Sequence, residues 1–372
     1  MSHLRSGGRV ILLVARTAVA ALVVLATSTL QSHQTATEPG TTDAAKEFIR
    51  ERLPLTDADL GAAEQGRTVV RTLDTTHPRE VATIAVLTVA VPPAFYFNQL
   101  RNVAVFKDTS RDVLEIGTFS MPASVADVER LSLGQEELEK VARCRPEECA
   151  IQLSREAIDR IRRAFSEKGV DPRGAADRTF RQILVGLVDG YRRRGDSALM
   201  TYADMKQPVD VAGAFRGMIS SPPAILSRFP VLSRHLASFP QISSDVEDMI
   251  YWSQQKLGGA IVVTVTHVSL AALDGPKVRG FSAASKQIYG SRYFDSSLGV
   301  TVVVSAGKRD GRPQSFLTYV NRSRIDALGG FWGRLARPVV RARTRSGIRK
   351  GLEAARSLVE RRFEEARTDA PQ

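Results

Sequence analysis

The chain has 372 residues, of which 43% are hydrophobic and 25% are charged, a balance that excludes an intrinsically disordered protein. Its net charge of +12 suggests a nucleic-acid partner, but the excess is local. Residues 322–350 hold nine basic side chains and one acid, and Arg5, Arg9 and Arg16 lie near the start. Because no nucleic-acid-binding module is visible, we expect no nucleic-acid partner.

The N-terminus has the features of an export signal. Three arginines accompany an apolar stretch that ends at Ala26, and small residues follow it. Residues 10–26 are too few to span a bilayer, which takes about 20 apolar residues. We therefore expect a cleaved signal peptide over 1–28, a flexible leader over 29–44 and a periplasmic or secreted protein. An uncleaved signal anchor that tethers the protein to a membrane is the alternative.

The next two segments differ in pattern. Residues 45–120 begin an α+β domain, with a strand predicted over 79–91, a helix over 94–106 and another strand over 111–120. Residues 121–245 are helical in pattern and are interpreted as an insertion. Within this insertion, Ser154 has the position of an N-cap, and apolar residues recur at helical spacing between Phe180 and Tyr191.

Residues 246–366 return to strands and complete the same domain. Five runs bounded by glycines or charged turns are predicted strands, over 248–257, 260–272, 279–289, 298–306 and 314–325. A long amphipathic helix follows, with one apolar face formed by Ile348, Leu352, Ala355, Val359 and Phe363. Residues 367–372 form a tail.

This order of elements resembles the START-like (SRPBCC-type) helix-grip fold, in which a curved antiparallel sheet wraps a long C-terminal helix around an apolar cavity. The expected fold class is therefore α+β, with a helical insertion that the usual family lacks. The phrases "SKQIYGSRYFDSSLGVTVVV" and "YVNRSRIDALGGFWGRL" are similar to those of an exported bacterial family of unassigned function. That family also carries a C-x4-C pair before its helical middle. The resemblance implies no catalytic residue.

The chain contains two cysteines, Cys144 and Cys149, in the segment "CRPEEC". In an oxidising compartment two such cysteines most simply pair with each other. Pro146 favours the turn that would bring them together. We expect a local disulfide at the entry to the helical insertion, rather than a redox or metal site.

Motifs of known enzyme classes are mostly absent from the chain. It has no G-x-S-x-G, phosphate-loop, H-E-x-x-H or strand-associated G-x-G-x-x-G motif. Past the leader its histidines are His77, His235 and His267, which lie far apart and have no carboxylates at ligand spacing. We expect no catalytic residue, no metal site and no cofactor.

Four polar side chains on predicted strands are candidates to line a ligand cavity. His267 ends an apolar row that includes Val263 and Val265, because side chains alternate along a strand. It is either a core-edge histidine with one hydrogen bond or a group that orients a ligand. Tyrosine rings in this region either pack in the core or face the ligand. The candidate lining residues are His267, Tyr289, Tyr319 and Asn321.

The basic stretch near the C-terminus interleaves large apolar groups with arginines. Such a composition is typical of a segment that lies in a membrane interface, where arginines meet lipid phosphates. The alternative is that its apolar groups cap the end of the final helix and its arginines are solvated. The candidate membrane-contact residues are Phe331, Trp332, Arg334, Leu335 and Arg337.

Three functions follow from these patterns. The leading hypothesis is an exported, non-catalytic protein that binds a lipid or another apolar small molecule and contacts anionic membranes. The second is a cell-envelope protein that binds a protein partner through residues 121–245. The third is an enzyme whose acid–base groups come from His267, Tyr289 or Lys286.

Overall fold

The computed structural model describes residues 41–102, 106–107, 110, 112–167, 169, 171–273 and 278–368, except the side chains of residues 330–332 and 334. The expected signal peptide over 1–28, the leader as far as residue 40 and residues 369–372 of the tail lie outside the described residues. Among the described helices, none combines the length and the apolar character that crossing a bilayer requires.

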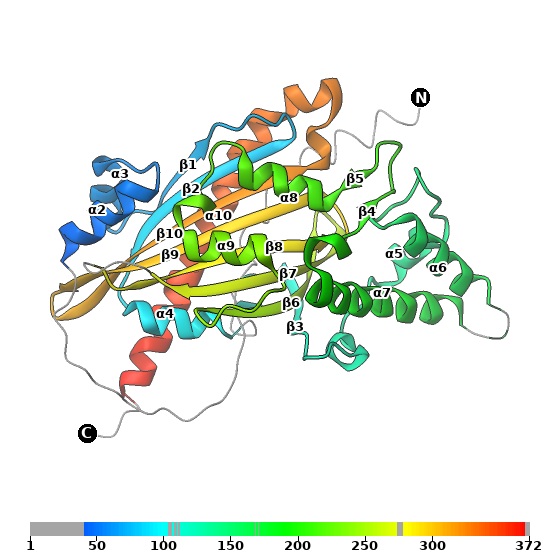
Figure 1. The fold of residues 1–372 in the computed structure, drawn as a ribbon, viewed down its shortest axis with the longest axis horizontal. Helices are drawn as coiled ribbons and strands as arrows, with labels where there is room; N and C mark the ends of the chain where they lie inside the picture. Colours follow the sequence, from blue (N-terminus) through cyan, green and yellow to red (C-terminus); the bar gives the residue numbers. More distant parts are fainter. Residues whose placement is uncertain are drawn as a thin grey trace.

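The centre of the fold is an eight-stranded antiparallel sheet with the strand order β1-β2-β10-β9-β8-β7-β6-β3 (Figure 1). Its strands are β1 (Val69–Leu73), β2 (Glu80–Val89), β3 (Val113–Thr118), β6 (Val246–Leu257), β7 (Ala260–Ala272), β8 (Gly280–Gly290), β9 (Phe294–Arg309) and β10 (Arg312–Ile325). The hairpins from β6 to β10 follow one another in the chain, as the predicted run of five strands required. A separate small ribbon pairs β4 (Thr201–Tyr202) with β5 (Val209–Asp210).

Helices cover both faces of the sheet. On one face lie α10 (Gly330–Thr368) and α4 (Pro93–Leu100); α10 passes behind the strands in Figure 1. On the other face lie α2 (Thr42–Arg52), α3 (Asp57–Glu64), α8 (Val211–Ser220) and α9 (Pro230–Ser238). The α+β fold class with a long C-terminal helix is confirmed, and it is compatible with a START-like fold.

Further helices form a lobe at one end of the molecule, on the right in Figure 1. They are α5 (Gln135–Ala142), α6 (Arg155–Phe165) and α7 (Pro172–Arg194), accompanied by the short 3-10 helices η2 (Val125–Val128) and η3 (Gly195–Ala198). A further 3-10 helix, η4 (Leu226–Arg228), lies beside α9 and outside this lobe. Ser154 caps α6 by accepting a hydrogen bond from Ala157 N, as its sequence position predicts. A last 3-10 helix, η5 (Asp326–Leu328), leads from β10 into α10.

Alternation along the strands divides the buried apolar residues into two main cores. In β2, Ile84 and Val86 belong to the core that α2, α3, α8, α9 and the lobe cover, whereas Ala85 and Leu87 belong to the core under α10. The α10 core contains four of the residues predicted to form the inner face of that helix: Ile348, Leu352, Ala355 and Val359. The sheet is therefore buried on both faces, and each strand except β3 carries side chains into both cores.

The expected disulfide is confirmed. Cys144 and Cys149 are joined by an S–S bond of 2.08 Å, with their Cα atoms 4.3 Å apart. Cys144 follows the C-terminus of α5, and a turn containing Pro146 brings Cys149 back to it. A structural disulfide fits an exported protein.

Candidate functional site

The side of the sheet that faces α10 is polar at one end and apolar at the other. The apolar end carries Leu87, Val268, Leu270, Ala283, Val303 and Leu317, which pack with the C-terminal half of α10. The polar end carries buried hydroxyl and amide side chains, namely Thr83, Ser253, Gln255, Thr266, Ser285, Thr301, Asn321 and Ser323. Burying so many polar groups between a sheet and a helix is costly unless they find partners, so this face is not an ordinary packed core.

Strand register brings the predicted residues Tyr319 and Asn321 into this polar end. Asn321 Nδ2 donates to Tyr319 Oη at 3.3 Å and to Ser297 Oγ at 3.1 Å. Ser323 Oγ donates to Asn321 Oδ1 at 2.8 Å, which completes a local network across β9 and β10. Burial raises the pKa of Tyr319 to about 12, so its hydroxyl stays protonated at neutral pH.

Gly299 leaves space at the polar end for the side chains of neighbouring strands. It pairs with Asn321 on β10 and with Ser285 on β8. A Cβ atom at position 299 would lie 2.3 Å from Ser285 Oγ, closer than any real contact. A larger residue would therefore displace the Ser285 hydroxyl from the middle of the polar end.

The residues of α10 that face the sheet, called here its inner stripe, also change from apolar at one end to more polar at the other. In its N-terminal half the half-buried Arg337 and Arg341 lie beside the buried Ala336, Val340 and Thr344, and farther along the stripe the buried residues from Ile348 to Val359 are all apolar. Thr344 is buried, and Arg341 Nε is buried without a described hydrogen-bond partner. Arg337 donates to Glu80 O at the start of β2, and Glu360 accepts a hydrogen bond from Ala90 N just past its end. The helix α10 therefore runs along the whole of β2, and its more polar half lies at the polar end of the sheet face.

The predicted membrane-contact residues divide into those with partners and those that are exposed. Arg337 donates to Pro78 O, Thr75 Oγ1 and Glu80 O, so it anchors α10 to the β1–β2 loop. Leu335 is 62% exposed and is free to meet a surface. The side chains of Phe331, Trp332 and Arg334 lie outside the described residues.

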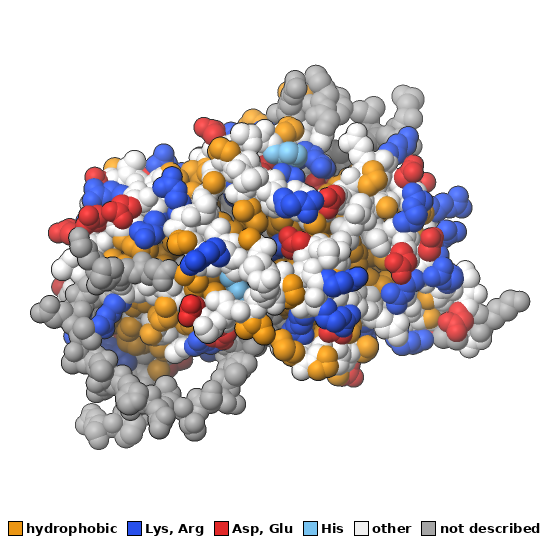
Figure 2. Space-filling view, in the orientation of Figure 1, with side chains coloured by type: hydrophobic (Ala, Val, Ile, Leu, Met, Phe, Trp, Pro, Cys, Tyr) orange, Lys and Arg blue, Asp and Glu red, His pale blue; other side chains and the backbone are white. Residues whose placement is uncertain are grey.

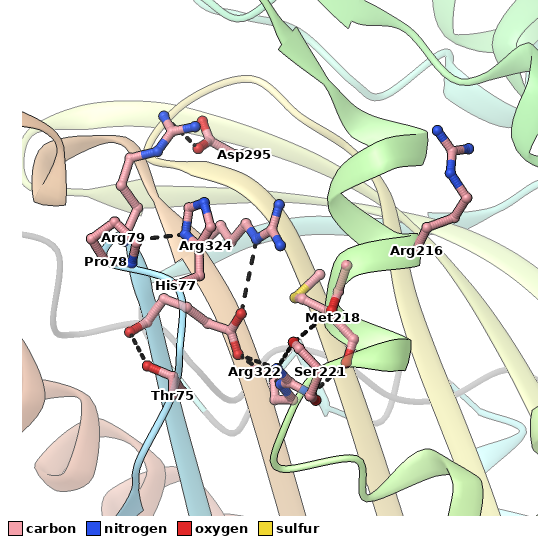
Figure 3. Close-up of polar contacts among 12 residues, drawn as sticks. Thr75, His77, Pro78, Arg79, Arg216, Met218, Ser221, Asp295, Arg322 and Arg324 are labelled. Atoms are coloured by element: carbon pink, nitrogen blue, oxygen red, sulfur yellow. Dashed lines mark hydrogen bonds and ion pairs between the residues drawn. The ribbon is translucent and has the colours of Figure 1, made fainter.

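A cluster of arginines lies on the opposite face of the sheet, near the C-terminal part of α8. Arg322 and Arg324 extend from β10 toward the C-terminal part of α8, and Arg79 reaches Asp295 with Nη1 2.9 Å from Oδ2 (Figure 3). Arg322 donates to the carbonyl oxygens of Ser221, Pro222 and Pro223 and therefore holds the turn after α8. Burial and the charges of Arg324, Arg79 and Arg337 lower the pKa of His77 to about 4, so this imidazole is neutral at pH 7.

The predicted residues His267 and Tyr289 lie on that opposite face, under the helical lobe. Four candidate lining residues are thus placed as two pairs, with the sheet between them. Tyr289 packs against the rings of Phe180 and Tyr202, and its hydroxyl is buried with no described partner. Burial raises the pKa of Tyr289 well above its usual value, which makes it a poor proton donor.

His267 belongs to a buried polar network with residues that the sequence patterns did not single out. Its Nδ1 lies 2.9 Å from Tyr191 Oη, and its Nε2 lies 2.8 Å from Asp248 Oδ1. From α9, His235 Nε2 lies 2.8 Å from Asp248 Oδ2. The potential ligand atoms of the three residues lie within 4.8 Å of one another, so two imidazoles and a carboxylate share one small space.

The electrostatics of this network favour a neutral imidazole beside an ionised carboxylate. Burial lowers the pKa of His267, although Asp248 opposes this effect. Burial also disfavours the charged form of Asp248, but hydrogen bonds from His267 and Ser269 lower its pKa. Lys286, the third candidate acid–base group, pairs with Asp196 and lies over the ring of Phe215. Burial lowers the pKa of Lys286, opposed by Asp196.

Sequence reasoning found His267 but missed Tyr191, His235 and Asp248. His267 and Tyr191 are 76 positions apart, and each belongs to an element whose local pattern is fully accounted for by core packing. Asp248 lies near the start of β6, where the strand pattern is still exposed. The polarity of the α10-facing side had a usable signal, since serine, threonine and asparagine alternate with apolar residues along the predicted strands.

No family model matches this chain, and comparison with curated proteins and with solved structures found no match. The antiparallel sheet and the long C-terminal helix are compatible with a START-like architecture. The similarity to an exported bacterial family stays an expectation. The chemistry of the two faces therefore has to carry the functional argument.

Proposed function

We propose that this protein is an exported, non-catalytic carrier of an anionic amphipathic ligand, which it binds between the sheet and α10. The observation that supports this proposal is the matched polarity of the two walls. Both are apolar around Leu317, Val303 and Leu352, and both become polar toward Asn321 and Thr344. A ligand with a hydrocarbon tail and a polar head fits such a change, because each end meets groups of its own kind.

The positive charge of Arg341 at the polar end of the proposed binding region favours a ligand with an anionic head group. Arg337 and Arg341 each have an Nε that is buried without a described hydrogen-bond partner, but the terminal nitrogens of Arg337 already donate to the β1–β2 loop. Arg341 is therefore the residue proposed to meet the head group. The hydroxyl and amide groups beside them supply neutral donors and acceptors. A carboxylate or phosphate head would therefore gain charge-assisted hydrogen bonds, while its tail gains about 25 cal/mol for each Å2 of apolar surface that it buries.

A ligand pair with the same tail tests the proposal directly. Oleate and oleyl alcohol differ only in the charge and shape of the head group, and their affinities for the purified chain can be compared by titration calorimetry after delipidation. We expect oleate to bind at least ten times more tightly than oleyl alcohol. We also expect native mass spectrometry of protein from its own host to show a bound lipid mass that denaturation removes.

Two single variants on α10 provide the matched control. Arg341→Gln removes the inward charge and should bring the two affinities together, whereas Arg345→Gln changes an exposed residue on the outer side of the same helix and should leave the ratio unchanged. Unchanged thermal unfolding shows that each variant is folded. Failure of the wild-type chain to bind either compound would refute the carrier function, and equal binding of both would refute the anionic head group.

The outer side of α10 adds a second element of the proposal, contact with an anionic membrane. Residues 327–352 contain seven basic residues and no acid. On this helix Leu335 and Val339 are 62% and 42% exposed, so apolar and basic groups reach solvent together. By contrast, the lobe face drawn in Figure 2 shows basic and acidic side chains interspersed over α5, α6 and α7. Membrane docking would place the ligand-binding region next to its source of lipid.

A further inference from the structure

We propose that His235, Asp248 and His267 form a binding site for one divalent transition-metal ion of the zinc class, on the face of the sheet opposite α10. The three residues come from three elements: α9, β6 and β7. Their potential ligand atoms, two imidazole Nε2 atoms and a carboxylate oxygen, lie within 4.8 Å of one another. This site is independent of the carrier function, because the sheet separates it from the α10 side.

The sheet register produces this arrangement. Asp248 and His267 lie on neighbouring strands and on the same face, since Asp248 pairs with Ser269 and Ile250 pairs with His267. Ser269 Oγ donates to Asp248 Oδ1 at 2.7 Å and so fixes the carboxylate. His235 reaches the same carboxylate from α9, which packs on β6 and β7. The sheet thus holds two of the proposed metal ligands, Asp248 and His267, and α9 supplies the third, His235.

The surroundings of His267 match those of a metal-bound imidazole. A ligating histidine usually donates the hydrogen of its other ring nitrogen to an oxygen atom, which fixes the tautomer and the ring orientation. Tyr191 Oη is placed for this role, 2.9 Å from His267 Nδ1. The ring of Phe239 lies 4.5 Å from the imidazole and prevents it from rotating away. In the metal-free chain the hydrogen of His267 lies on Nε2, which faces Asp248. An ion at this site would shift the hydrogen to Nδ1, where Tyr191 Oη can accept it, and would leave the lone pair of Nε2 for the metal.

Burial and access are also suited to an ion. The side chains of His235 and His267 are 1% and 0% exposed, whereas that of Asp248 is 28% exposed. The ion would therefore enter past Asp248 and keep one or more coordination positions for water on that side. Two imidazoles and one carboxylate favour zinc and later first-row divalent ions, and they disfavour magnesium and calcium, which take oxygen ligands.

Zinc titration of tag-free, full-length protein that has been treated with a chelator tests the site. We expect one Zn2+ ion per chain with a dissociation constant in the micromolar range or tighter, and no comparable binding of Mg2+. Co2+ should produce visible absorption bands of a four- or five-coordinate site. X-ray absorption of the zinc complex should show two imidazole ligands, a result that surface binding would not give.

Single variants separate this site from other histidines. His235→Gln and Asp248→Asn should each weaken Zn2+ binding at least tenfold, whereas His77→Gln, at a histidine outside the cluster, should not change it. His235 lies on α9 rather than in the central sheet, and circular dichroism checks that the His235→Gln variant is folded. If Zn2+ does not bind stoichiometrically, or if His235→Gln binds it as well as the wild-type chain, the three residues form only a hydrogen-bond network and the proposal is wrong.

Discussion

Glu80 and Arg322 form an ion pair between neighbouring strands in which both side chains are almost completely removed from solvent. Arg322 Nε lies 2.7 Å from Glu80 Oε1, and the two side chains are 4% and 0% exposed. The terminal nitrogens of Arg322 also bind backbone carbonyl oxygens at and just after the C-terminal end of α8. The pair therefore connects β2 and β10 to the helical side of the molecule, and it explains why this buried arginine is not available to a ligand.

Breaking this pair should destabilise the fold strongly. Glu80→Gln leaves the guanidinium of Arg322 buried without its counter-charge, so we expect the free energy of unfolding to fall by about 3–5 kcal/mol. Asp57→Asn is the control, because it removes one partner of the exposed Arg50–Asp57 pair and should cost less than about 1 kcal/mol. Urea unfolding followed by circular dichroism measures both. Equal effects of the two substitutions would contradict the structural role of Glu80.

Asp295 should make stability depend on pH in an unusual direction. Burial raises its pKa from 3.8 to about 7, against the opposing charge of Arg79. The folded chain therefore binds more protons than the unfolded chain between about pH 4 and pH 7, and the contribution of Asp295 to stability falls as pH rises through that range. Asp295→Asn removes this contribution.

The measurement is the difference in unfolding free energy between Asp295→Asn and the wild-type chain at several pH values. We expect the variant to gain stability relative to the wild-type chain from pH 4 to pH 7 and to show a constant difference above pH 8. Asp310→Asn changes a side chain that is 93% exposed and should give a flat difference. Parallel profiles for Asp295→Asn and the wild-type chain would show that Asp295 ionises normally.

The disulfide should contribute a modest part of the stability. Replacing both Cys144 and Cys149 by serine opens a short loop, for which the chain-entropy model gives a loss of about 2 kcal/mol. Thermal unfolding with and without reductant measures the loss, and the double variant should not respond to reductant. Mass measurement after alkylation shows the redox state. Two free thiols in protein collected from the export compartment would argue against the disulfide.

The sequence predicted the strands of the sheet well because their signals are local. The five strands from β6 to β10 and the helix α10 were all expected, since β-branched runs bounded by turns and a long apolar stripe specify them. β1 was not expected, because its five residues are mostly half-buried and carry no clear alternation. Nor were α2 and α3, whose apolar residues are few.

The candidate site depends on tertiary packing, which the local sequence patterns do not predict. Alternation along a strand tells which residues share a face, but it does not tell which face meets α10. Tyr319 and His267 were therefore grouped together, although β10 presents the first to α10 and β7 presents the second to the helical lobe. The contact of His235 with Asp248 depends on how α9 packs across the sheet, and no local pattern records that packing.

The exposed basic side of α10 should bind anionic membranes. Arg345, Arg349 and Lys350 are exposed, and each basic residue near an anionic surface contributes about 1 kcal/mol. Replacing all three by glutamine should therefore weaken binding to phosphatidylglycerol vesicles on the order of 100-fold, while neutral phosphatidylcholine vesicles bind neither protein. Vesicle co-sedimentation at low and high salt measures the effect, since screening reduces electrostatic binding.

A second triple variant on the lobe shows whether the effect belongs to α10 or to net charge alone. Arg155, Arg162 and Arg163 on α6 are also exposed, and their replacement by glutamine removes the same charge from another surface. We expect this variant to bind vesicles nearly as well as the wild-type chain, because the lobe mixes basic and acidic side chains. Equal weakening by the two triple variants would mean that the membrane recognises the overall charge of the protein, and α10 would then have no special role in docking.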